Sequence, residues 1–261
     1  MAGSELLVER RGHLLSLVLN RPAARNAVSP AMLEMLTAAI EEARSARTDV
    51  VTITGAGGYF CAGADIASYT TPHARLAELE AFTRAARNLC RAIETLDAVT
   101  VAAVDGPCLG GGFEIALACD LIIAADTARF GLPETRLGLI PGWGGTQRLT
   151  AAIGAPRARR VILTAETLPA ATAHEWGVVA RVVADSELAV ELDRFTDDLL
   201  SRAPRALTAA KRAIAAVTGH HWPTHGADVE TTELMSMFAS ADGAEGIDAF
   251  VTKRPPHFTG A

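Results

Sequence analysis

Residues 106–114 have the sequence GPCLGGGFE, in which three consecutive glycines precede a glutamate. An apolar run rich in β-branched residues at 99–104 ends just before this stretch, and apolar residues follow it. Glycine allows the backbone to turn tightly and to approach a neighbouring group or a ligand closely. We therefore predict a strand at 99–104, a glycine-rich loop and a helix at 110–118. A further apolar strand is predicted at 121–125.

The same alternation of strands and helices extends toward the N-terminus. Apolar runs bounded by turn residues predict strands, and apolar residues at a 3.6-residue period predict helices. Ser29 and Pro30 mark the start of one helix, because serine caps a first turn and proline fits its first position. The other predicted elements are strands at 6–9, 14–20 and 50–54 and a long amphipathic helix at 73–96. Repeated strand–helix units of this kind predict an α/β core.

The last third of the chain has a different character. After a predicted strand at 178–183, apolar residues recur mostly at helical spacing. The predicted helices are at 186–202, 204–217 and 227–240. We interpret this part as a helical C-terminal region that serves in oligomerisation.

The composition is typical of a globular protein with a large core. Of 261 residues, 49% are hydrophobic and 21% are charged, and the net charge is −6 with acids and bases interspersed. This pattern predicts no nucleic-acid partner. No window approaches about 18 consecutive apolar residues, so we expect no membrane span. The four cysteines form no CxxC pair, which favours a reducing, cytoplasmic location.

A second glycine-bearing stretch, GGYFCAGADI at 57–66, also follows a strand. If it meets the 106–114 loop, backbone N–H groups from both can face one oxygen atom that gains negative charge. In such an oxyanion hole each donor typically lowers the barrier by about 3 kcal/mol. The alternative interpretation is that both stretches are ordinary tight turns. Neither has the Gly-Lys-Ser/Thr of a phosphate-binding loop or the GxGxxG spacing of dinucleotide sites.

Two glutamates lie in largely apolar stretches near these loops. Glu114 stands about one helical turn beyond Gly111, and Glu134 ends the segment FGLPE at 130–134. A carboxyl group in apolar surroundings can serve as a general acid or base. The alternative is that Glu114 only favours a helix start and that Glu134 is solvated.

Taken in order, the motifs resemble those of the enoyl-CoA hydratase/isomerase (crotonase) superfamily over nearly the whole chain. Each segment is weak evidence alone, but their order and spacing together make the resemblance specific. The matching segments are NRP at 20–22 with NA at 26–27, FCAGADI at 60–66, GGGFE at 110–114, ACD at 118–120, FGLPE at 130–134, GLIPGWGGTQRL at 138–149 and FVTKR at 250–254.

The resemblance implies an α/β fold in which repeated ββα units form a spiral, followed by a helical trimerisation region. We place the spiral core with the active site at residues 1–195 and the helical oligomerisation region at 196–261. Members of this family are commonly trimers, or hexamers built from two trimers. A homotrimer or homohexamer is therefore expected.

The resemblance also implies catalytic roles. Ala64 and Gly111 occupy the positions whose backbone N–H groups hold the thioester carbonyl oxygen. Glu114 and Glu134 occupy the two positions that act on water in hydratases. Glu114 is expected to take a proton from the water that attacks the β-carbon, and Glu134, in its acid form, to donate a proton to the α-carbon. No metal and no cofactor are expected, because coenzyme A is part of the substrate and the seven histidines are scattered.

Other positions are carried over as substrate contacts. Some family members have a cation near the nucleotide phosphates where this chain has Ala23 and Ala67. Arg25 and Lys253 are the candidate replacements, and the alternative for Lys253 is an ordinary surface position. Trp143 stands where many relatives have a small residue, and it either narrows the acyl pocket, covers the water site or packs in the core. The expected substrate-binding residues are Ala62, Asp65, Ile66, Gly110, Pro133, Gly142, Trp143, Phe250 and Lys253.

Several polar or reactive residues near the motifs are expected to be structural. Asp65 and Asp120 are predicted to orient backbone by hydrogen bonding. Cys61 and Cys108 are predicted to be small buried residues rather than nucleophiles, because no activating base is evident.

The sequence therefore predicts a hydratase that adds water syn across the double bond of a trans-2-enoyl-CoA and yields a 3-hydroxyacyl-CoA, in fatty-acid or related acyl-CoA degradation. Double-bond isomerases usually need one acid/base and commonly lack an acid at the position of Glu114, so both glutamates together favour hydration. An isomerase, or a hydratase for branched, aromatic or carnitine-linked substrates, is the alternative. A non-catalytic or RNA-binding family member is an alternative of another class, and it would need a basic helical stripe.

Overall fold

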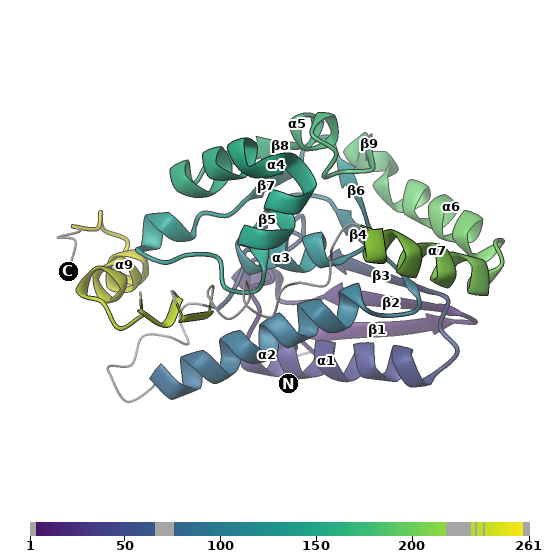
Figure 1. Ribbon diagram of the computed structural model, residues 1–261, viewed down its shortest axis with the longest axis horizontal. Helices are drawn as coiled ribbons and strands as arrows, with labels where there is room; N and C mark the ends of the chain where they lie inside the picture. Colours follow the sequence, from purple (N-terminus) through teal and green to yellow (C-terminus); the bar gives the residue numbers. More distant parts are fainter. Residues whose placement is uncertain (1–3, 66–75, 218–230, 233, 237, 258–261) are drawn as a thin grey trace.

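A six-stranded sheet runs through the centre of the structure (Figure 1). The computed structural model describes residues 4–65, 76–217, 231–232, 234–236 and 238–257. The order of the strands is β1-β2-β3-β4-β6-β9; β1 and β2 pair antiparallel, and every later pair is parallel. The strands are β1 (Leu6–Arg11), β2 (Leu14–Leu19), β3 (Val50–Gly55), β4 (Val99–Val104), β6 (Leu121–Ala125) and β9 (Arg181–Val183).

A smaller sheet of three short strands lies beside the first, in the order β5-β7-β8. Two successive units therefore repeat one pattern: a strand in the large sheet, a strand in the small sheet and then a helix. The units are β4–β5–α3 and β6–β7–α4, and β5 pairs parallel with β7. This arrangement confirms the predicted spiral of ββα units. The elements are β5 (Pro107–Leu109), α3 (Gly111–Ala118), β7 (Arg129–Gly131), α4 (Gly145–Thr164) and β8 (Thr167–Pro169).

Helices cover both faces of the large sheet, which explains why its middle strands are apolar throughout. All six residues of β4 are buried. Because side chains alternate between faces along a strand, Val101 and Ala103 pack toward α6 and α7, whereas Ala102 and Val104 face the main core with α1, α2 and α3. The helices are α1 (Pro30–Ser45), α2 (Leu76–Glu94), α6 (Leu188–Leu200) and α7 (Pro204–Val217).

The C-terminal part adds a separate small core at the end of the molecule where the chain terminates (Figure 1). Leu139, Leu234 and Ile247 form this cluster, and α9 packs against η3. Within the described ranges, no helix is long and apolar enough to cross a membrane. The remaining elements are η1 (Pro22–Ala24), η3 (Glu134–Leu137), α5 (Ala170–Glu175), η4 (Asp185–Glu187) and α9 (Ala241–Thr252).

Most predicted elements are found where the sequence placed them. Leu6–Arg11 and Leu14–Leu19 form the hairpin, and the Ser29 side chain caps α1 by accepting a hydrogen bond from the Met32 N–H, 3.0 Å away. The helix predicted at 73–96 is observed from residue 76, where its described part begins, to residue 94. In the predicted helix at 227–240, the described residues up to 238 are helical.

The strand predicted at 178–183 was wrong in its first half, because β9 begins only at Arg181. The N–H groups of Val178 and Val179 both donate to the Ala173 carbonyl, so these residues close the turn after α5 instead of joining the sheet. The helix α9 and the small sheet were not predicted. The division of the chain after residue 195 stays a prediction, and that point falls within α6.

Asp120 ties three elements together at the end of α3. One carboxylate oxygen, Oδ2, accepts hydrogen bonds from the Thr100 N–H (2.8 Å) and the Thr100 hydroxyl (2.9 Å) on β4. The same oxygen forms an ion pair with Lys211 Nζ on α7 at 2.7 Å. The expected structural role of Asp120 is thus confirmed.

Replacing Asp120 by alanine is expected to lower the free energy of unfolding by about 1–3 kcal/mol, because the buried donors of Thr100 lose their acceptor. Urea unfolding followed by circular dichroism measures the change. Asp126→Ala is the matched control, because Asp126 is exposed at the other end of β6, and it should change stability by less than about 0.5 kcal/mol. Equal losses in the two variants would contradict the role given to Asp120.

Candidate active site

The two glycine-rich loops lie against each other, as the oxyanion-hole hypothesis requires. The Cys61 N–H donates to the Pro107 carbonyl (3.2 Å), and the Leu109 N–H donates to the Cys61 carbonyl (2.9 Å). These bonds form a parallel bridge between Cys61 and Cys108. The loops that follow β3 and β4 are therefore held side by side by backbone pairing, which does not depend on side-chain identity.

Ala64 and Gly111 occupy corresponding places on these two loops. Ala64 forms a parallel bridge with Val28, in which the neighbouring residues Gly63 and Asp65 make the hydrogen bonds. Gly111 is the first residue of α3, where helix N–H groups have no partner inside the helix. Within the described part of the chain, neither the Ala64 N–H nor the Gly111 N–H donates to another protein group. Both residues line the same cavity.

Glycine is required at the start of α3 for two reasons. Gly110 has a positive φ of 53°, which residues with a side chain disfavour, and a Cβ there would lie 3.0 Å from Glu134 Oε1. A Cβ on Gly111 would lie 2.2 Å from the Trp143 ring. The triple glycine therefore lets the start of α3 approach both Glu134 and Trp143.

Glu114 is buried on α3, with only 2% of its surface exposed. Its Oε1 atom accepts hydrogen bonds from the Trp143 N–H and the Gly145 N–H, each at 2.7 Å. Gly145 is the first residue of α4, so the carboxylate lies at the positive end of that helix. Charge-assisted bonds of this kind fix the carboxylate in place and stabilise its ionised form.

Glu134 reaches the same cavity from the other loop. It is the first residue of η3, directly after Pro133, and its Oε1 atom lies close to Gly110. Both glutamates line the cavity together with Ala64 and Gly111. The arrangement brings two carboxyl groups and two backbone donors to one small space, which suits proton transfer at a polarised carbonyl compound.

The cavity has a volume of about 80 Å³, and most of the side chains that line it are apolar. Nine of the sequence-predicted site residues line it, and seven further residues were not predicted. Of these seven, Gly63, Leu139 and Ile140 lie in the matching motifs, and the other four are brought to the cavity only by the fold. The predicted residues are Ala62, Ala64, Gly110, Gly111, Glu114, Pro133, Glu134, Gly142 and Trp143; the others are Gly63, Thr83, Leu137, Leu139, Ile140, Leu234 and Phe238.

Trp143 belongs both to the cavity wall and to the core. It is 4% exposed, and its ring packs edge-on against Phe82 with centroids 5.8 Å apart. The ring also covers Gly111. Core packing, one of the alternatives considered for this tryptophan, is therefore confirmed, and Trp143 also lines the cavity.

Some predicted contacts lie away from the cavity. The Asp65 side chain accepts a hydrogen bond from Arg21 Nη2 at 2.9 Å, and its N–H donates to the Val28 carbonyl, so it holds the loop. Phe250 and Lys253 lie at the end of α9, with Phe250 56% exposed. Ile66 lies outside the described residues.

The residues proposed to be structural cysteines are fully buried. Burial raises the pKa of the Cys61 thiol to about 12 and raises that of Cys108 well above its ordinary value. Both thiols are therefore protonated at neutral pH and are poor nucleophiles. All four cysteines of the chain are free.

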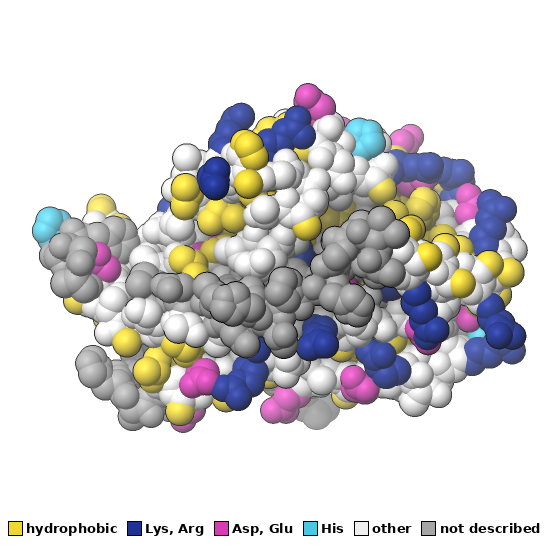
Figure 2. All heavy atoms as spheres, viewed as in Figure 1, with side chains coloured by type: hydrophobic (Ala, Val, Ile, Leu, Met, Phe, Trp, Pro, Cys, Tyr) yellow, Lys and Arg dark blue, Asp and Glu magenta, His cyan; other side chains and the backbone are white. Residues whose placement is uncertain are grey.

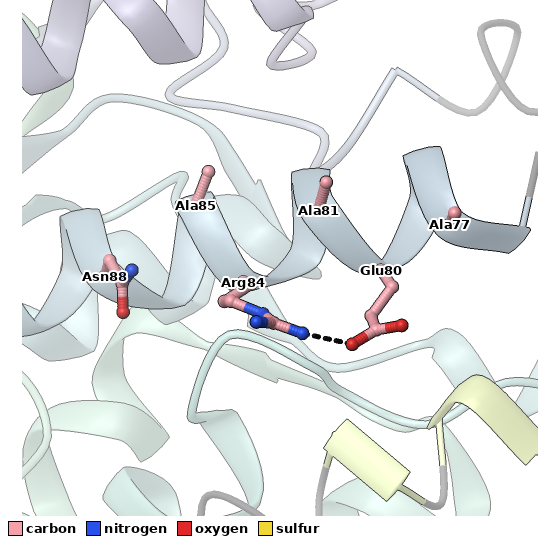
Figure 3. Close-up of a pocket in the computed structure, with 6 residues that line it drawn as sticks. All are labelled: Ala77, Glu80, Ala81, Arg84, Ala85 and Asn88. Atoms are coloured by element: carbon pink, nitrogen blue, oxygen red, sulfur yellow. Dashed lines mark hydrogen bonds and ion pairs between the residues drawn. The ribbon is translucent and has the colours of Figure 1, made fainter.

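A second, larger hollow lies along the outer face of α2 (Figure 3). Among the described residues that line it, Glu80 and Arg84 are charged and form an ion pair with each other. None of the described residues that were expected to bind substrate lines it. Its lining residues are Ala77, Glu80, Ala81, Arg84, Ala85 and Asn88.

The repeated ββα units and the site at the start of α3 define a protein with the crotonase fold. Residues 9–261 match the family described as enoyl-CoA hydratase/isomerase. The chain belongs to this family, which confirms the resemblance inferred from the motifs.

Individual relatives extend the match over the full length. The chain is 39% identical over 260 residues to a probable enoyl-CoA hydratase of Mycobacterium tuberculosis, with 99% of both chains covered. It is 37% identical over 264 residues to the 2,3-dehydroadipyl-CoA hydratase of Escherichia coli, covering 98% of this chain and 99% of that one. A crystal structure of an enoyl-CoA hydratase from Mycobacterium avium subsp. paratuberculosis is similar with a TM-score of 0.88 at 34% identity, with 98% of both chains covered.

Proposed function

We propose that this chain is an enoyl-CoA hydratase that adds water syn across the double bond of a trans-2-enoyl-CoA and yields a 3-hydroxyacyl-CoA. The observation that carries the proposal is the meeting of Glu114, Glu134, Ala64 and Gly111 around one cavity. The hydratase names of relatives at 37–39% identity support the same reaction. Fatty-acid or related acyl-CoA degradation is the process that such a reaction would serve.

In the proposed mechanism, the thioester carbonyl oxygen binds between the N–H groups of Ala64 and Gly111. Negative charge develops on this oxygen as water attacks the β-carbon, so donors fixed in advance stabilise the transition state more than the substrate. Gly111 adds the positive end of α3 to this effect.

The two glutamates are proposed to handle the protons. Glu114 accepts a proton from the water as its oxygen bonds to the β-carbon, and Glu134 in its acid form donates a proton to the α-carbon. The bonds from Trp143 and Gly145 to Glu114 Oε1 support its role as the base, because they favour a carboxylate that is ionised before the reaction. The chain's own side chains suffice for these steps, so no metal or cofactor is included in the proposal.

The coenzyme A part of the substrate is proposed to leave the cavity past Ala62. The Ala62 N–H donates to the Arg25 carbonyl at 3.0 Å, which places Arg25 beside this loop. Arg25 is thus a candidate cation for the nucleotide phosphates, in place of the alanines at positions 23 and 67.

Isomerisation is the alternative on the same scaffold. It needs only one acid/base group, whereas both glutamates line the cavity here.

For the RNA-binding alternative, a continuous basic surface would be needed. On the face drawn in Figure 2, described Lys and Arg side chains are spread out with Asp and Glu side chains among them. These observations favour hydration.

We also propose a cytoplasmic homotrimer or homohexamer. The four free cysteines support a reducing compartment. Two neighbouring exposed apolar side chains on α9, Phe250 (56%) and Val251 (42%), support burial against another copy of the chain. In such an assembly Phe250 and Lys253 would contact the substrate of a neighbouring subunit.

Light scattering during size-exclusion chromatography is expected to give three or six times the mass of one 27.3 kDa chain. Phe250→Asp should reduce this mass, because a charge would enter an apolar interface. Ala180→Asp, at an exposed position between α5 and β9, is the control and should not change it. A monomeric wild-type protein would contradict the proposed homotrimer or homohexamer.

Purified protein mixed with crotonyl-CoA, or with a longer trans-2-enoyl-CoA, is expected to lose the absorbance of the conjugated thioester as water adds across the double bond. Mass spectrometry should show a gain of one water in the product. An isomerase would instead move the double bond without a change of mass. If no chain length from short to long is hydrated, the proposed activity is wrong, although the fold assignment stands.

Glu114→Gln and Glu134→Gln are each expected to lower kcat by about 100-fold or more with little change in KM, because each removes a proton-transfer group but keeps the shape of the side chain. Glu187→Gln, at an exposed position in η4, serves as the control and should have wild-type kinetics. A near-normal kcat in either active-site variant would show that its role is assigned wrongly.

A further inference from the structure

A buried ion pair lies behind Glu114, outside the cavity. Arg148 on α4 is 5% exposed at its side chain and Glu94 at the end of α2 is 17% exposed, with Arg148 Nη2 3.0 Å from Glu94 Oε2. Neither residue lines the cavity. Burying an ion pair is costly, and apolar residues of similar size often stabilise a fold better. The pair therefore calls for a role other than packing.

The other hydrogen bonds of Arg148 indicate that role. Its Nη1 atom donates to the Trp143 carbonyl at 2.9 Å, and its own N–H donates to the Gly144 carbonyl at 2.9 Å. The peptide groups of this same segment donate to Glu114 from the Trp143 and Gly145 N–H groups. Arg148 thus binds carbonyl groups of the segment 143–145, and N–H groups of the same segment bind the Glu114 carboxylate.

Electrostatic attraction also links Arg148 with Glu94 and Glu114. The carboxylates of Glu94 and Glu114 both attract the Arg148 guanidinium. The cation therefore interacts with two anions, of which Glu114 lines the cavity and Glu94 does not. Other titratable groups in these surroundings are Glu134 across the cavity and Cys90 on α2.

We infer that Arg148, held by Glu94, is a positioning residue for Glu114: it fixes the Trp143–Gly145 segment and supplies a positive charge that keeps Glu114 ionised as the base. The inference rests on the proposed hydratase function. It assigns opposite electrostatic effects to the two members of the pair. Arg148 favours the ionised glutamate, whereas Glu94 partly offsets this effect.

The test compares Arg148→Met, Arg148→Lys and Glu94→Gln with the wild type, by measuring kcat and KM for crotonyl-CoA over a range of pH. Arg148→Met should lower kcat by about 10- to 100-fold with little change in KM, as seen for residues that orient a reacting group. It should also move the acidic limb of kcat/KM to higher pH by about one unit. Arg148→Lys keeps the charge and should keep the limb near its wild-type position.

Glu94→Gln should move the acidic limb in the opposite direction, to lower pH, because it removes an anion from the neighbourhood of Glu114. Packing defects alone would not produce shifts of opposite sign. Arg160→Met and Glu166→Gln are matched controls, because Arg160 lies on the same helix and forms an ion pair with Glu166 at the surface. Both controls should have the wild-type pH profile.

An unchanged limb and kcat in Arg148→Met, or shifts of the same sign in Arg148→Met and Glu94→Gln, would overturn the inference. If Arg148→Met does not fold, the other two variants test the inference. Glu94→Gln should move the acidic limb to lower pH and Arg148→Lys should leave it near its wild-type position, and any other pair of results would overturn the inference. If the wild type shows no hydration, the proposed function fails separately. Infrared titration of the Glu114 carboxylate, identified by its loss in Glu114→Gln, then tests for the same opposite shifts without turnover.

Discussion

Parallel backbone pairing between successive turns of the chain is the constraint on which the site depends. Because β3, β4 and β6 lie side by side in parallel, the loops that follow them leave the sheet at one edge. The bridge between Cys61 and Cys108 and the pairing of β5 with β7 continue this alignment beyond the sheet. Residues that are 20 to 70 positions apart in sequence thereby meet around one cavity. The site is therefore a product of the repeat and not of any single motif.

Burial of Glu114 is the most demanding local feature of this arrangement. A carboxylate with 2% exposure would be strongly destabilised without hydrogen-bond donors. Gly145, the first residue of α4, and Trp143, two residues before it, supply two such donors at 2.7 Å, and these donors are backbone groups of one short segment. The helix start that satisfies Glu114 also carries Trp143, whose ring covers Gly111. The position of the Glu114 carboxylate, the stabilisation of its charge and the shape of the cavity beside Gly111 thus depend on the same short segment around Trp143 and Gly145.

The sequence predicted the parts of the molecule that depend on local pattern. Ser29 with Pro30 marked a helix start, the apolar run at 99–104 marked a buried strand, and the motif positions around Glu114 and Glu134 led to the cavity. The three-residue strands of the small sheet escaped prediction, because runs so short show no periodicity. Val178 and Val179 resembled the start of a strand in composition, but hydrogen bonds from their N–H groups to the Ala173 carbonyl tie them to a turn. The pairing of Arg148 with Glu94 also has no local signal, since 54 positions separate the two residues.

The two sides of the cavity differ in how the sequence encodes them. The polar side comes from short motifs with fixed spacing, so its chemistry follows from a few contiguous stretches. The apolar side combines Thr83 on α2, Trp143 before α4, and Leu234 and Phe238 near the C-terminus. Of these, Thr83, Leu234 and Phe238 lie outside the matching motifs, whereas Trp143 lies within GLIPGWGGTQRL and binds Glu114 through its N–H group. Because an acyl group is selected mainly by the shape of its apolar surroundings, one catalytic arrangement can serve different acyl groups. This separation explains why motifs identify the reaction more firmly than the substrate.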